Sequence, residues 1–296
     1  MDIRVLRYFL TIVREGSFSR AAETLFITQP TLSRQIAQLE NELGTKLFLR
    51  DKQLTLTDSG LMLRRRAEEM LELMDIIKSE FQSGDELSGK ISIGCGGLRS
   101  VNVLMEEMAR FKQLYPKVTF ELYTNSAEDI KEKLDRGLLD FAILLEPIEI
   151  QKYHYLRIET KERWGLFMPS SSPLAAQAEI TKRDLINLPL IMSNRQALQK
   201  EIAHWLRLDW DELKIVATYN IITNVAEMVS NNLGYAMTIE GAVEQFDPAR
   251  FTFTPFTPPL EMTSVIAWKR ASSFNAADTF LAHLKSSNFV EKTQNQ

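Results

Sequence analysis

Apolar residues recur at helical spacing through the first 57 residues of the chain and predict three short helices. Ser17 or Ser19 can cap the second helix, and Thr28 can cap the third. Pro30 suits the first turn of the third helix, where a missing N–H costs no hydrogen bond, and Gly44 suits its end. The expected buried stripes are Leu6, Phe9, Leu10 and Val13, then Phe18, Ala21, Ala22 and Leu25, then Leu32, Ile36, Leu39 and Leu43.

The third helix carries a polar face opposite its apolar stripe. Gln and Arg side chains can make paired hydrogen bonds to adenine and guanine edges, whereas Ser, Thr and a helix N-terminus suit phosphates. Two short helices before an outward polar helix are typical of a helix-turn-helix. The alternative is a polar face that only contacts solvent. The residues on this side, or at the entering end of the helix, are Gln29, Pro30, Thr31, Ser33, Arg34, Gln38 and Asn41.

The residues after this helix favour nucleic-acid binding. Lys46–Arg50 and Leu54–Thr57 predict two short strands, and a hairpin in this place is typical of a wing. Residues 1–66 carry 11 basic and 7 acidic side chains, a net charge of +4, although the whole chain has −4. A local excess of basic residues favours binding to a polyanion.

Residues 58–87 predict one uninterrupted helix with its own apolar seam. Spacings of four and three residues in turn place the seam along one side of the helix, as in a coiled coil. Such a seam could also pack along its own domain. The flanking domains look self-contained, so we expect a homodimer through this helix. The seam consists of Leu63, Ala67, Met70, Met74, Ile77 and Phe81.

From Ser88 onward, short apolar strands alternate with helices, which indicates βα units on a largely parallel sheet. In such sheets, ligands bind beyond the carboxyl ends of the strands. The predicted strands are 91–94, 118–123, 140–145, 164–168, 190–192, 215–219, 235–239 and 263–269. The predicted helices are 100–115, 126–136, 196–208, 223–231 and 274–285.

Composition narrows the class of protein. The 296 residues are 45% hydrophobic and 25% charged, typical of a globular chain with two or more domains. The longest apolar run, Phe141–Leu145, is far too short to span a membrane, and the N-terminus has no apolar signal core. The single cysteine cannot form an internal disulfide. We therefore expect a cytoplasmic protein.

The sequence holds no pattern typical of an enzyme or a metal site. The three histidines are widely separated, and there is no G-x-S-x-G, H-E-x-x-H or Walker loop. Gly94–Arg99 begins like a dinucleotide-binding turn, but Arg99 stands at the third glycine. Cys95 could sense oxidants, but no second cysteine exists to pair with it. We expect no catalytic residue, no cofactor and no metal.

Several motifs resemble those of the LysR-type transcriptional regulators. They cover about the first 65 residues, whereas the rest resembles the family in length and in its alternation of strands and helices. The motifs are FSRAA at Phe18–Ala22, TQPTLSRQI at Thr28–Ile36, LENELG at Leu39–Gly44, Leu47-Phe48 and Leu56-Thr57.

The resemblance implies an α/β protein with an N-terminal winged helix-turn-helix, a long linker helix and a two-lobed, periplasmic-binding-protein-like domain. The expected ranges are 1–58, 59–87 and 88–296, with lobe I at 88–161 and 268–296 and lobe II at 162–267. The implied function is transcription regulation through DNA binding in response to a small-molecule effector. The implied partners are operator DNA, the effector and copies of itself as a dimer or tetramer, with RNA polymerase as a further candidate.

The base-reading Gln, Pro and Arg of that family correspond to Gln29, Pro30 and Arg34. The wing departs from the family, because Asp51-Lys52-Gln53 is one residue shorter and less basic. Lys52 is therefore the one wing residue that could replace the family's basic residues in contacting the minor groove. The DNA-contacting residues that we expect are Ser19, Arg20, Thr28, Gln29, Pro30, Thr31, Ser33, Arg34, Gln38, Arg50 and Lys52.

The family architecture also implies an effector site where four segments meet between the lobes. Ser100, Ser126 and Thr223 are each placed to cap a helix, and positive helix ends near Arg99 or Arg195 favour an anion. With apolar neighbours, this predicts a small carboxylate with an apolar part. Ser100 is the first choice, because it follows the Gly96-Gly97 turn. The expected residues are Leu98, Arg99, Ser100, Asn125, Ser126, Met192, Ser193, Asn194, Arg195, Ile222 and Thr223.

One rival interpretation belongs to another class. The chain could be a solute-binding or enzymatic α/β protein whose N-terminal helices only mediate interactions. The polar surface from Gln29 to Arg34 discriminates between the two, because only a DNA-binding protein needs it.

Overall fold

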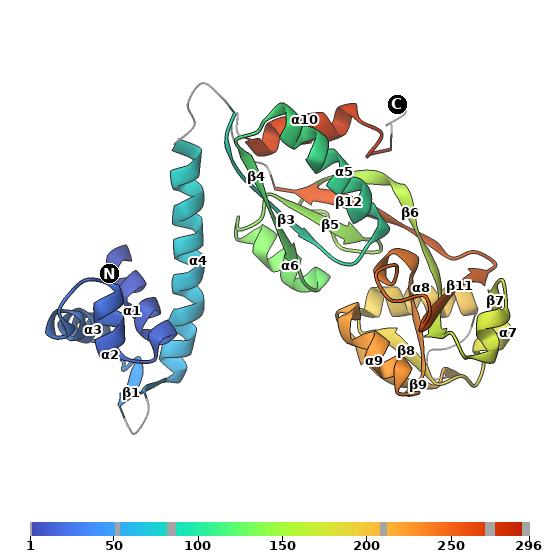
Figure 1. Cartoon of the computed structure of the whole chain (residues 1–296), viewed down its shortest axis with the longest axis horizontal. Coiled ribbons are helices and arrows are strands. Elements are labelled where there is room, and N and C mark those ends of the chain that lie inside the picture. Colours follow the sequence, from blue (N-terminus) through green and yellow to red (C-terminus); the bar gives the residue numbers. More distant parts are fainter. Residues whose placement is uncertain (1, 51–53, 82–86, 208–211, 270–275, 292–296) are drawn as a thin grey trace. The chain divides into compact units, whose positions relative to one another are not determined.

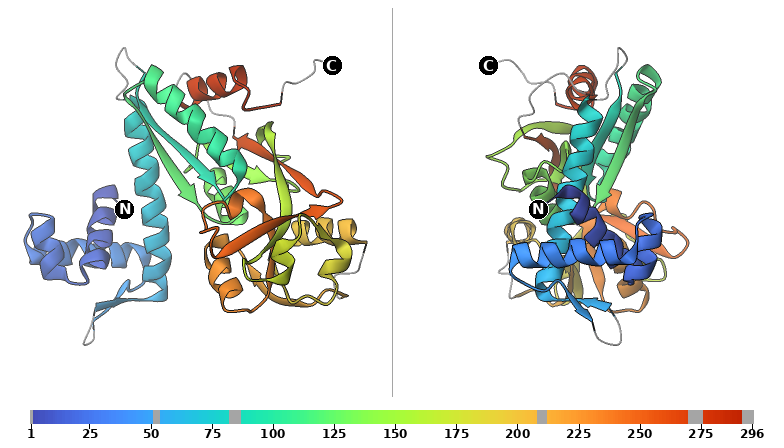
Figure 2. Two further views of the ribbon diagram at one scale, coloured as in Figure 1. Left: turned by 45° about the vertical axis from the view of Figure 1, so that its right-hand side comes forward. Right: turned by 90° about the vertical axis from the view of Figure 1, so that its left-hand side faces the viewer.

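The computed structural model describes residues 2–50, 54–81, 87–207, 212–269 and 276–291. The chain divides into two compact units, Met1–Gln82 and Ser83–Gln296. Each unit has a hydrophobic core of its own. Figure 2 gives two further views of the ribbon.

Unit 1 contains the predicted helices and hairpin (Figure 1). The two strands pair antiparallel, with Phe48 opposite Leu56. Phe9, Leu32 and Ile36 are fully buried in its core. Its elements are α1 (Ile3–Glu15), α2 (Phe18–Thr24), α3 (Gln29–Leu43), β1 (Phe48–Arg50), β2 (Leu54–Leu56) and α4 (Asp58–Phe81).

All three buried stripes differ from the prediction in part; in α2, Phe18 and Leu25 are only half-buried. In α1 the fully buried side chains include Val5 and Ile12, whereas Leu10 and Val13 are only half-buried. The reason is that Leu10 and Val13 pack at the edge of the core and also line a groove beside α4. Leu43 is 42% exposed, because it lies in the last turn of α3, beyond the residues that α1 covers.

Unit 2 holds a mixed sheet covered by helices. Its strands are β3 (Gly89–Cys95), β4 (Val118–Thr124), β5 (Phe141–Leu145), β6 (His154–Pro169), β7 (Ile180–Thr181), β8 (Leu190–Ser193), β9 (Ile215–Tyr219), β10 (Tyr235–Ile239), β11 (Phe251–Thr257) and β12 (Glu261–Trp268). Its helices are α5 (Arg99–Leu114), α6 (Ala127–Asp135), α7 (Lys182–Leu185), α8 (Gln196–Leu206), α9 (Val225–Ser230) and α10 (Ala276–Ser286), with short 3-10 turns η1 (Pro173–Ala176), η3 (Ile222–Asn224) and η4 (Glu240–Ala242).

The strand order β4-β3-β5-β12-β6-β10-β8-β9 forms two lobes that share β6. Lobe I comprises β3, β4, β5, β12 and the first half of β6, and lobe II comprises the second half of β6 with β7 to β11. Within the lobes, β3 pairs parallel with β4 and β5, and β8 pairs parallel with β9 and β10. β6 and β12 run antiparallel to their neighbours, so the sheet is more mixed than predicted.

β6 is much longer than the predicted strand 164–168. Its first half pairs with β12 from His154 to Arg163, and the register of that pairing shifts between Thr263 and Val265. Its second half pairs with β10 and β11. Strands β7 and β11 were not predicted, and the predicted helix 223–231 consists of η3 followed by α9.

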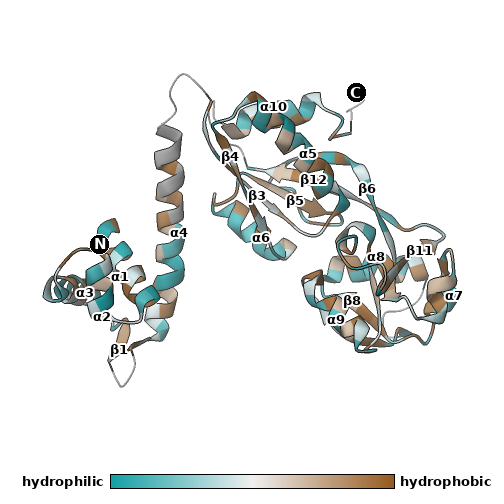
Figure 3. Cartoon of the chain, viewed as in Figure 1, coloured by the Kyte–Doolittle hydropathy of each residue, from teal (hydrophilic) through white to brown (hydrophobic). Residues whose placement is uncertain are grey.

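Alternate side chains of β5 pack into two different hydrophobic cores, one on each face of the sheet in lobe I. Phe141, Ile143 and Leu145 belong to the core that includes side chains of α5 and α10, whereas Ala142 and Leu144 belong to a second core with α6. Successive side chains of a strand point to opposite faces, so this strand needs apolar residues throughout. Figure 1 shows α5 and α10 side by side, and β5 is brown along its length in Figure 3.

Candidate functional site

Local capping places the start of α3. The Thr28 hydroxyl accepts from the backbone N–H of Thr31 at 3.4 Å, and Pro30 lies in the first turn. Gly44 ends the helix in a left-handed conformation with φ of 67°. Ser17, rather than Ser19, caps α2 by accepting from Arg20 N–H. The capping predictions for Thr28, Pro30 and Gly44 are confirmed.

The predicted outward residues of α3 are on the surface. Its inner face buries Leu32, Ile36 and Leu39. Ser33 is half-buried, and its hydroxyl accepts from the Gln29 side-chain amide at 2.9 Å. The exposed members of the predicted set are Ser19, Arg20, Thr28, Gln29, Pro30, Thr31, Arg34 and Gln38. Lys52 and the Arg50 side chain lie outside the described residues.

A buried carboxylate ties the end of α3 to the hairpin. Glu40, only 6% exposed, accepts from Leu47 N–H at 2.9 Å and from the Lys46 ammonium at 2.7 Å. Burial raises the pKa of Glu40, but the hydrogen bonds from Lys46 and Leu47 outweigh it, so the pKa lies below its ordinary value. No signal in the sequence indicated this contact.

The seam of α4 has two parts. Leu63 packs against the core of unit 1 and Ala67 is fully buried, so the first turns pack on their own unit. Further along, Met70 and Ile77 are each 40% exposed, and Met74 is half-buried. The Phe81 side chain lies outside the described residues. Only the second part of the seam is therefore open to a partner helix.

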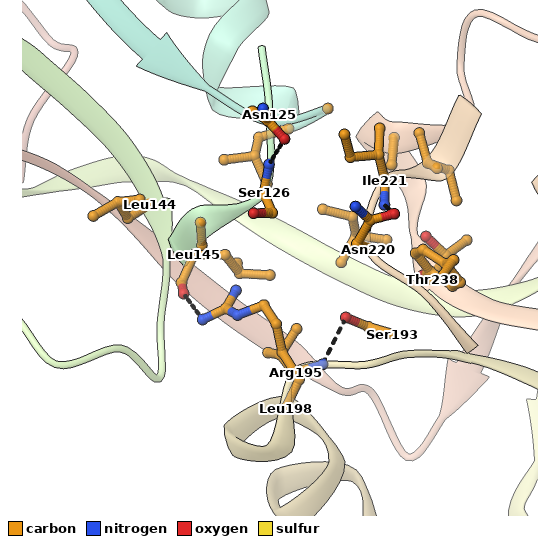
Figure 4. Close-up of a pocket in the computed structure, with 18 of the residues that line it drawn as sticks. Asn125, Ser126, Leu144, Leu145, Ser193, Arg195, Leu198, Asn220, Ile221 and Thr238 are labelled. Atoms are coloured by element: carbon orange, nitrogen blue, oxygen red, sulfur yellow. Dashed lines mark hydrogen bonds between the residues drawn. The ribbon is translucent and has the colours of Figure 1, made fainter. Parts of the chain in front are cut away.

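A pocket lies between the lobes of unit 2, where strands from both lobes end (Figure 4). Lobe I contributes the turns after β3 and β4 and the end of β5, and lobe II contributes the ends of β8, β9 and β10. The space within it is about 740 Å³, part of which is open to solvent. This is where ligands bind in sheets of this kind.

Six of the eleven predicted effector residues line this pocket. They are Leu98, Asn125, Ser126, Ser193, Arg195 and Ile222. Ser126 caps α6 as predicted, by accepting from Asp129 N–H at 3.3 Å. The predicted residues outside the lining are Arg99, Ser100, Met192, Asn194 and Thr223.

The capping predictions for Ser100 and Thr223 are wrong. Ser100 is fully buried inside α5, whose N-cap is Leu98, and Thr223 lies within η3, whose N-cap is Ile221. Each helix begins one or two residues earlier than its pattern suggests, so the hydroxyl falls past the capping position. Met192 is buried in the core.

The N-terminus of α5 already holds an anion from the chain. The Glu162 carboxylate, fully buried on β6, accepts from Arg99 N–H at 3.0 Å and from Ser100 N–H at 2.9 Å. The Arg99 guanidinium pairs with Glu240 at 3.4 Å instead of facing the pocket. The expected anion site beside Ser100 is thus filled by Glu162, which satisfies the free N–H groups of the helix.

Arg195 is the one charged residue among those that line the pocket. It precedes α8, and its guanidinium donates to the Leu145 carbonyl at 3.1 Å (Figure 4) and to the Pro147 carbonyl at 2.9 Å. Its side chain is 13% exposed, and Glu128, 3.9 Å away, is 68% exposed. Burial lowers the pKa of Arg195 more than Glu128 raises it. The charge is therefore poorly compensated within the described chain.

Several lining residues were missed by the sequence. Tyr219 donates through its hydroxyl to the Met237 carbonyl at 3.2 Å, and burial raises its pKa to about 12, so it stays neutral. The signal that could have found most of them is their position at strand ends, which the alternation of elements already predicted. The missed polar and aromatic members are Thr124, Trp164, Tyr219, Asn220 and Thr238.

The described residues bear on three further features, namely a metal site, a reactive thiol and a membrane-spanning helix. No group of three or more His, Cys, Asp and Glu side chains there could hold a metal ion. Burial raises the pKa of the Cys95 thiol, which disfavours the reactive thiolate. No described helix is long and apolar enough to cross a membrane.

A capped helix-turn-helix with a hairpin, joined to a two-lobed domain with a pocket, defines a ligand-responsive DNA-binding protein. The chain belongs to the LysR family of transcriptional regulators. A family model for the lysR-family bacterial regulatory helix-turn-helix protein matches residues 3–61, and one for the LysR substrate binding domain matches residues 84–288.

Individual relatives agree with this assignment. The chain is 31% identical to the uncharacterized HTH-type transcriptional regulator YvbU of Bacillus subtilis, over 81% of this chain and 82% of that protein. It is 28% identical to the Hca operon transcriptional activator HcaR of Escherichia coli, over 95% and 96%. The crystal structure of CbnR, a LysR family transcriptional regulator, has the same fold, with a TM-score of 0.78 at 18% identity over 97% and 99%. The chain is thus a DNA-binding transcriptional regulator with an effector-binding domain, rather than an enzyme.

Proposed function

We propose that the effector of this regulator is a small carboxylate with an apolar part, bound in the pocket between the lobes. The observation that supports this most is Arg195, a buried cation whose nearest carboxylate, Glu128, is mostly in water. A buried charge without a full partner is costly, and a guanidinium matches a carboxylate in geometry. An anionic ligand at Arg195 removes that cost.

The remaining walls suit the rest of such a ligand. The neutral polar groups of Asn125, Ser126 and Ser193 can donate hydrogen bonds to a carboxylate without adding charge. The apolar wall, which would contact the carbon skeleton, includes Leu98, Ile130, Leu144, Leu145, Leu198 and Ile222.

DNA binding is proposed for the exposed face of α3, with Gln29, Pro30 and Arg34 at base edges. Their exposure and the capped start of α3 support this. We further propose that copies of the chain dimerise through the exposed part of the α4 seam, at Met70, Met74 and Ile77. RNA polymerase is a further candidate partner.

Domain bounds at 1–58, 59–87 and 88–296 also belong to this proposal. Helix α4, which begins at Asp58, would be the linker. Support comes from the division of the chain at Gln82 and from the family matches at residues 3–61 and 84–288.

The test of the effector class uses the full chain and pairs of compounds in which a carboxylate is compared with the corresponding primary alcohol. Benzoate is compared with benzyl alcohol, and hexanoate with 1-hexanol, by thermal shift. A ligand that prefers the native state raises the Tm. We expect the carboxylates to raise the Tm more than the alcohols, and Arg195→Gln to remove that difference.

Arg183→Gln is the matched control, because Arg183 is an exposed arginine of the same lobe outside the pocket. It should leave the carboxylate preference unchanged. Equal shifts from carboxylates and alcohols in the wild-type chain would contradict the proposal.

A further inference from the structure

The backbones of the two lobes meet beside the pocket at two glycines. Gly241 of η4, in lobe II, lies against the first turn of α5, in lobe I. A Cβ on Gly241 would be 2.2 Å from Arg99 N and 2.7 Å from Arg99 Cα. Gly97 of lobe I faces lobe II in turn, and a Cβ there would lie 3.4 Å from Ala242 Cα. Glycine permits so close an approach because it has no side chain. We call these four residues the glycine contact.

Both sides of the glycine contact are held in place. The Arg99 N–H donates to the buried Glu162 carboxylate at 3.0 Å, so the start of α5 cannot retreat without breaking this bond. On the other side, η4 is anchored by Ala242 and Val243, which are each 5% exposed. Extra volume at the contact therefore acts on the separation of the lobes rather than on either segment alone.

Charged and polar groups reinforce the glycine contact. The Glu240 carboxylate, next to Gly241, accepts from the Arg163 guanidinium of β6 at 2.7 and 3.2 Å. It also pairs with Arg99 of lobe I at 3.4 Å. One turn further along α5, the Asn102 side chain donates to Glu244 at 3.1 Å. Single ion pairs at a surface contribute little, but one carboxylate shared by two guanidiniums forms a network with a defined geometry.

The glycine contact adjoins the wall of the pocket. Gly97 and Leu98 line the pocket from lobe I, and Ala242 lines it from lobe II. Glu240 and Gly241 do not line it, although they immediately precede Ala242 in the chain. The spacing between the two walls on this side of the pocket is therefore fixed by residues outside it.

We propose that Glu240 and Gly241 are positioning residues of the effector site, which set the distance between its two walls without contacting the ligand. The inference rests on the proposed function, but the wall distance is measurable without a ligand. Separation of the lobes at this contact moves Arg195 of lobe II away from Asn125 and Ser126 of lobe I (Figure 4). A small ligand then no longer reaches both walls at once.

The first experiment measures the distance between the lobes in the free, full chain. Spin labels are placed at Glu132→Cys in α6 and Glu201→Cys in α8, two helices that begin at opposite walls of the pocket. The native Cys95 is buried, so the introduced thiols take the labels. By double electron–electron resonance, we expect Gly241→Ala to lengthen the mean distance by about 1 Å or more, because the added Cβ must retreat that far to reach ordinary contact.

Gly234→Ala is the matched control. A Cβ at Gly234 would lie 2.5 Å from the Pro189 carbonyl oxygen, a comparable clash, but both residues belong to lobe II. This variant should lower the Tm and leave the distance between the lobes unchanged. An unchanged distance in folded Gly241→Ala overturns the proposal, because the strain is then absorbed within one lobe.

Glu240→Gln is the milder variant and decides the matter if Gly241→Ala does not fold. It keeps the shape of the side chain and removes its charge, so we expect a wider distribution of interlobe distances. The control is Glu146→Gln, because Glu146 accepts from the Arg157 guanidinium at 3.2 and 3.3 Å within lobe I alone. A distribution as narrow in Glu240→Gln as in the wild type removes Glu240 from the positioning role.

Benzoate and hexanoate then report on binding. We expect their Kd to rise about tenfold in Gly241→Ala, the lower part of the range for overpacking, and to stay unchanged in Gly234→Ala. A longer interlobe distance with an unaltered Kd overturns the positioning role. If the carboxylates bind no better than their alcohols, the proposed function fails, whereas the interlobe distance still decides whether Glu240 and Gly241 set the separation of the walls.

Discussion

Replacement of Glu40 tests how α3 is joined to the hairpin. Glu40→Ala removes the acceptor for the buried Leu47 N–H, whereas the Lys46 partner is 71% exposed and contributes little. A hydrogen bond to a charged group contributes about 2–3 kcal/mol. Its loss here leaves the buried Leu47 N–H with no hydrogen-bond partner, because water cannot reach it. At 1.36 kcal/mol for each factor of ten, that is about a 30- to 160-fold change in the opening equilibrium.

Hydrogen exchange followed by mass spectrometry measures this change in unit 1 alone. Peptides that cover α3 and β1 should exchange faster by that factor in Glu40→Ala, because exchange reports the free energy of local opening. Glu42→Ala, an exposed carboxylate of the same helix, should have little effect. Protection in Glu40→Ala that matches the wild type would refute the argument from burial.

The pH dependence has a definite sign. The pKa of Glu40 is lowered on folding from its ordinary value of 4.5, so its contribution is present above that value and is lost as pH falls through the folded pKa. The difference in protection between wild type and Glu40→Gln should therefore be largest near neutral pH and shrink toward acid. A difference that grows toward acid would contradict this sign.

Three further predictions concern unit 1. Arg34→Ala should cost about 1–3 kcal/mol on a specific operator and relax base preference there, by gel shift; unchanged specificity would remove Arg34 from the base-reading set. Met74→Asp should weaken dimerisation at least about tenfold in sedimentation, because it desolvates a charge, whereas Met62→Asp, off the seam, should not. Gly60→Ala should destabilise unit 1 by about 1–3 kcal/mol, because a Cβ there would lie 2.2 Å from the Leu47 carbonyl oxygen; an unchanged urea midpoint would show that α4 can shift.

Unit 1 was predictable from sequence because its signals are local. Thr28, Pro30 and Gly44 fix the ends of α3 through contacts within a few residues, and the apolar spacing fixes its inner face. The Glu40 contact was not predictable, since it joins a charged residue to a backbone N–H seven positions away.

Unit 2 was less predictable because its strands depend on distant pairing. Pro255 interrupts the pattern of β11, and a proline argues against a central strand, yet it pairs with Gly165, which has no side chain of its own and leaves room for the Phe253 ring. The first half of β6 has exposed, charged positions and is a strand because β12, about a hundred residues later, pairs with it.

The pocket was predicted only in part, because some of its residues have local sequence signals and others do not. Asn125 and Ser126 follow a clear strand, so their place at the sheet edge could be inferred. Trp164 sits inside a strand, and its place in the pocket depends on how β6 passes between the lobes, which no periodicity reveals. The occupation of the α5 N-terminus by Glu162 joins residues more than 60 positions apart.

The continuity of β6 through both lobes has a mechanical consequence. β6 is hydrogen-bonded to β12 in lobe I and to β10 and β11 in lobe II, so any motion between the lobes along this strand must twist or bend its ladders. The compliant point is the register shift between Thr263 and Val265 of β12, where the ladder is interrupted. Trp164 lies just past that interruption on β6 and lines the pocket, so the pocket wall stands next to the point where the shared ladder bends most easily.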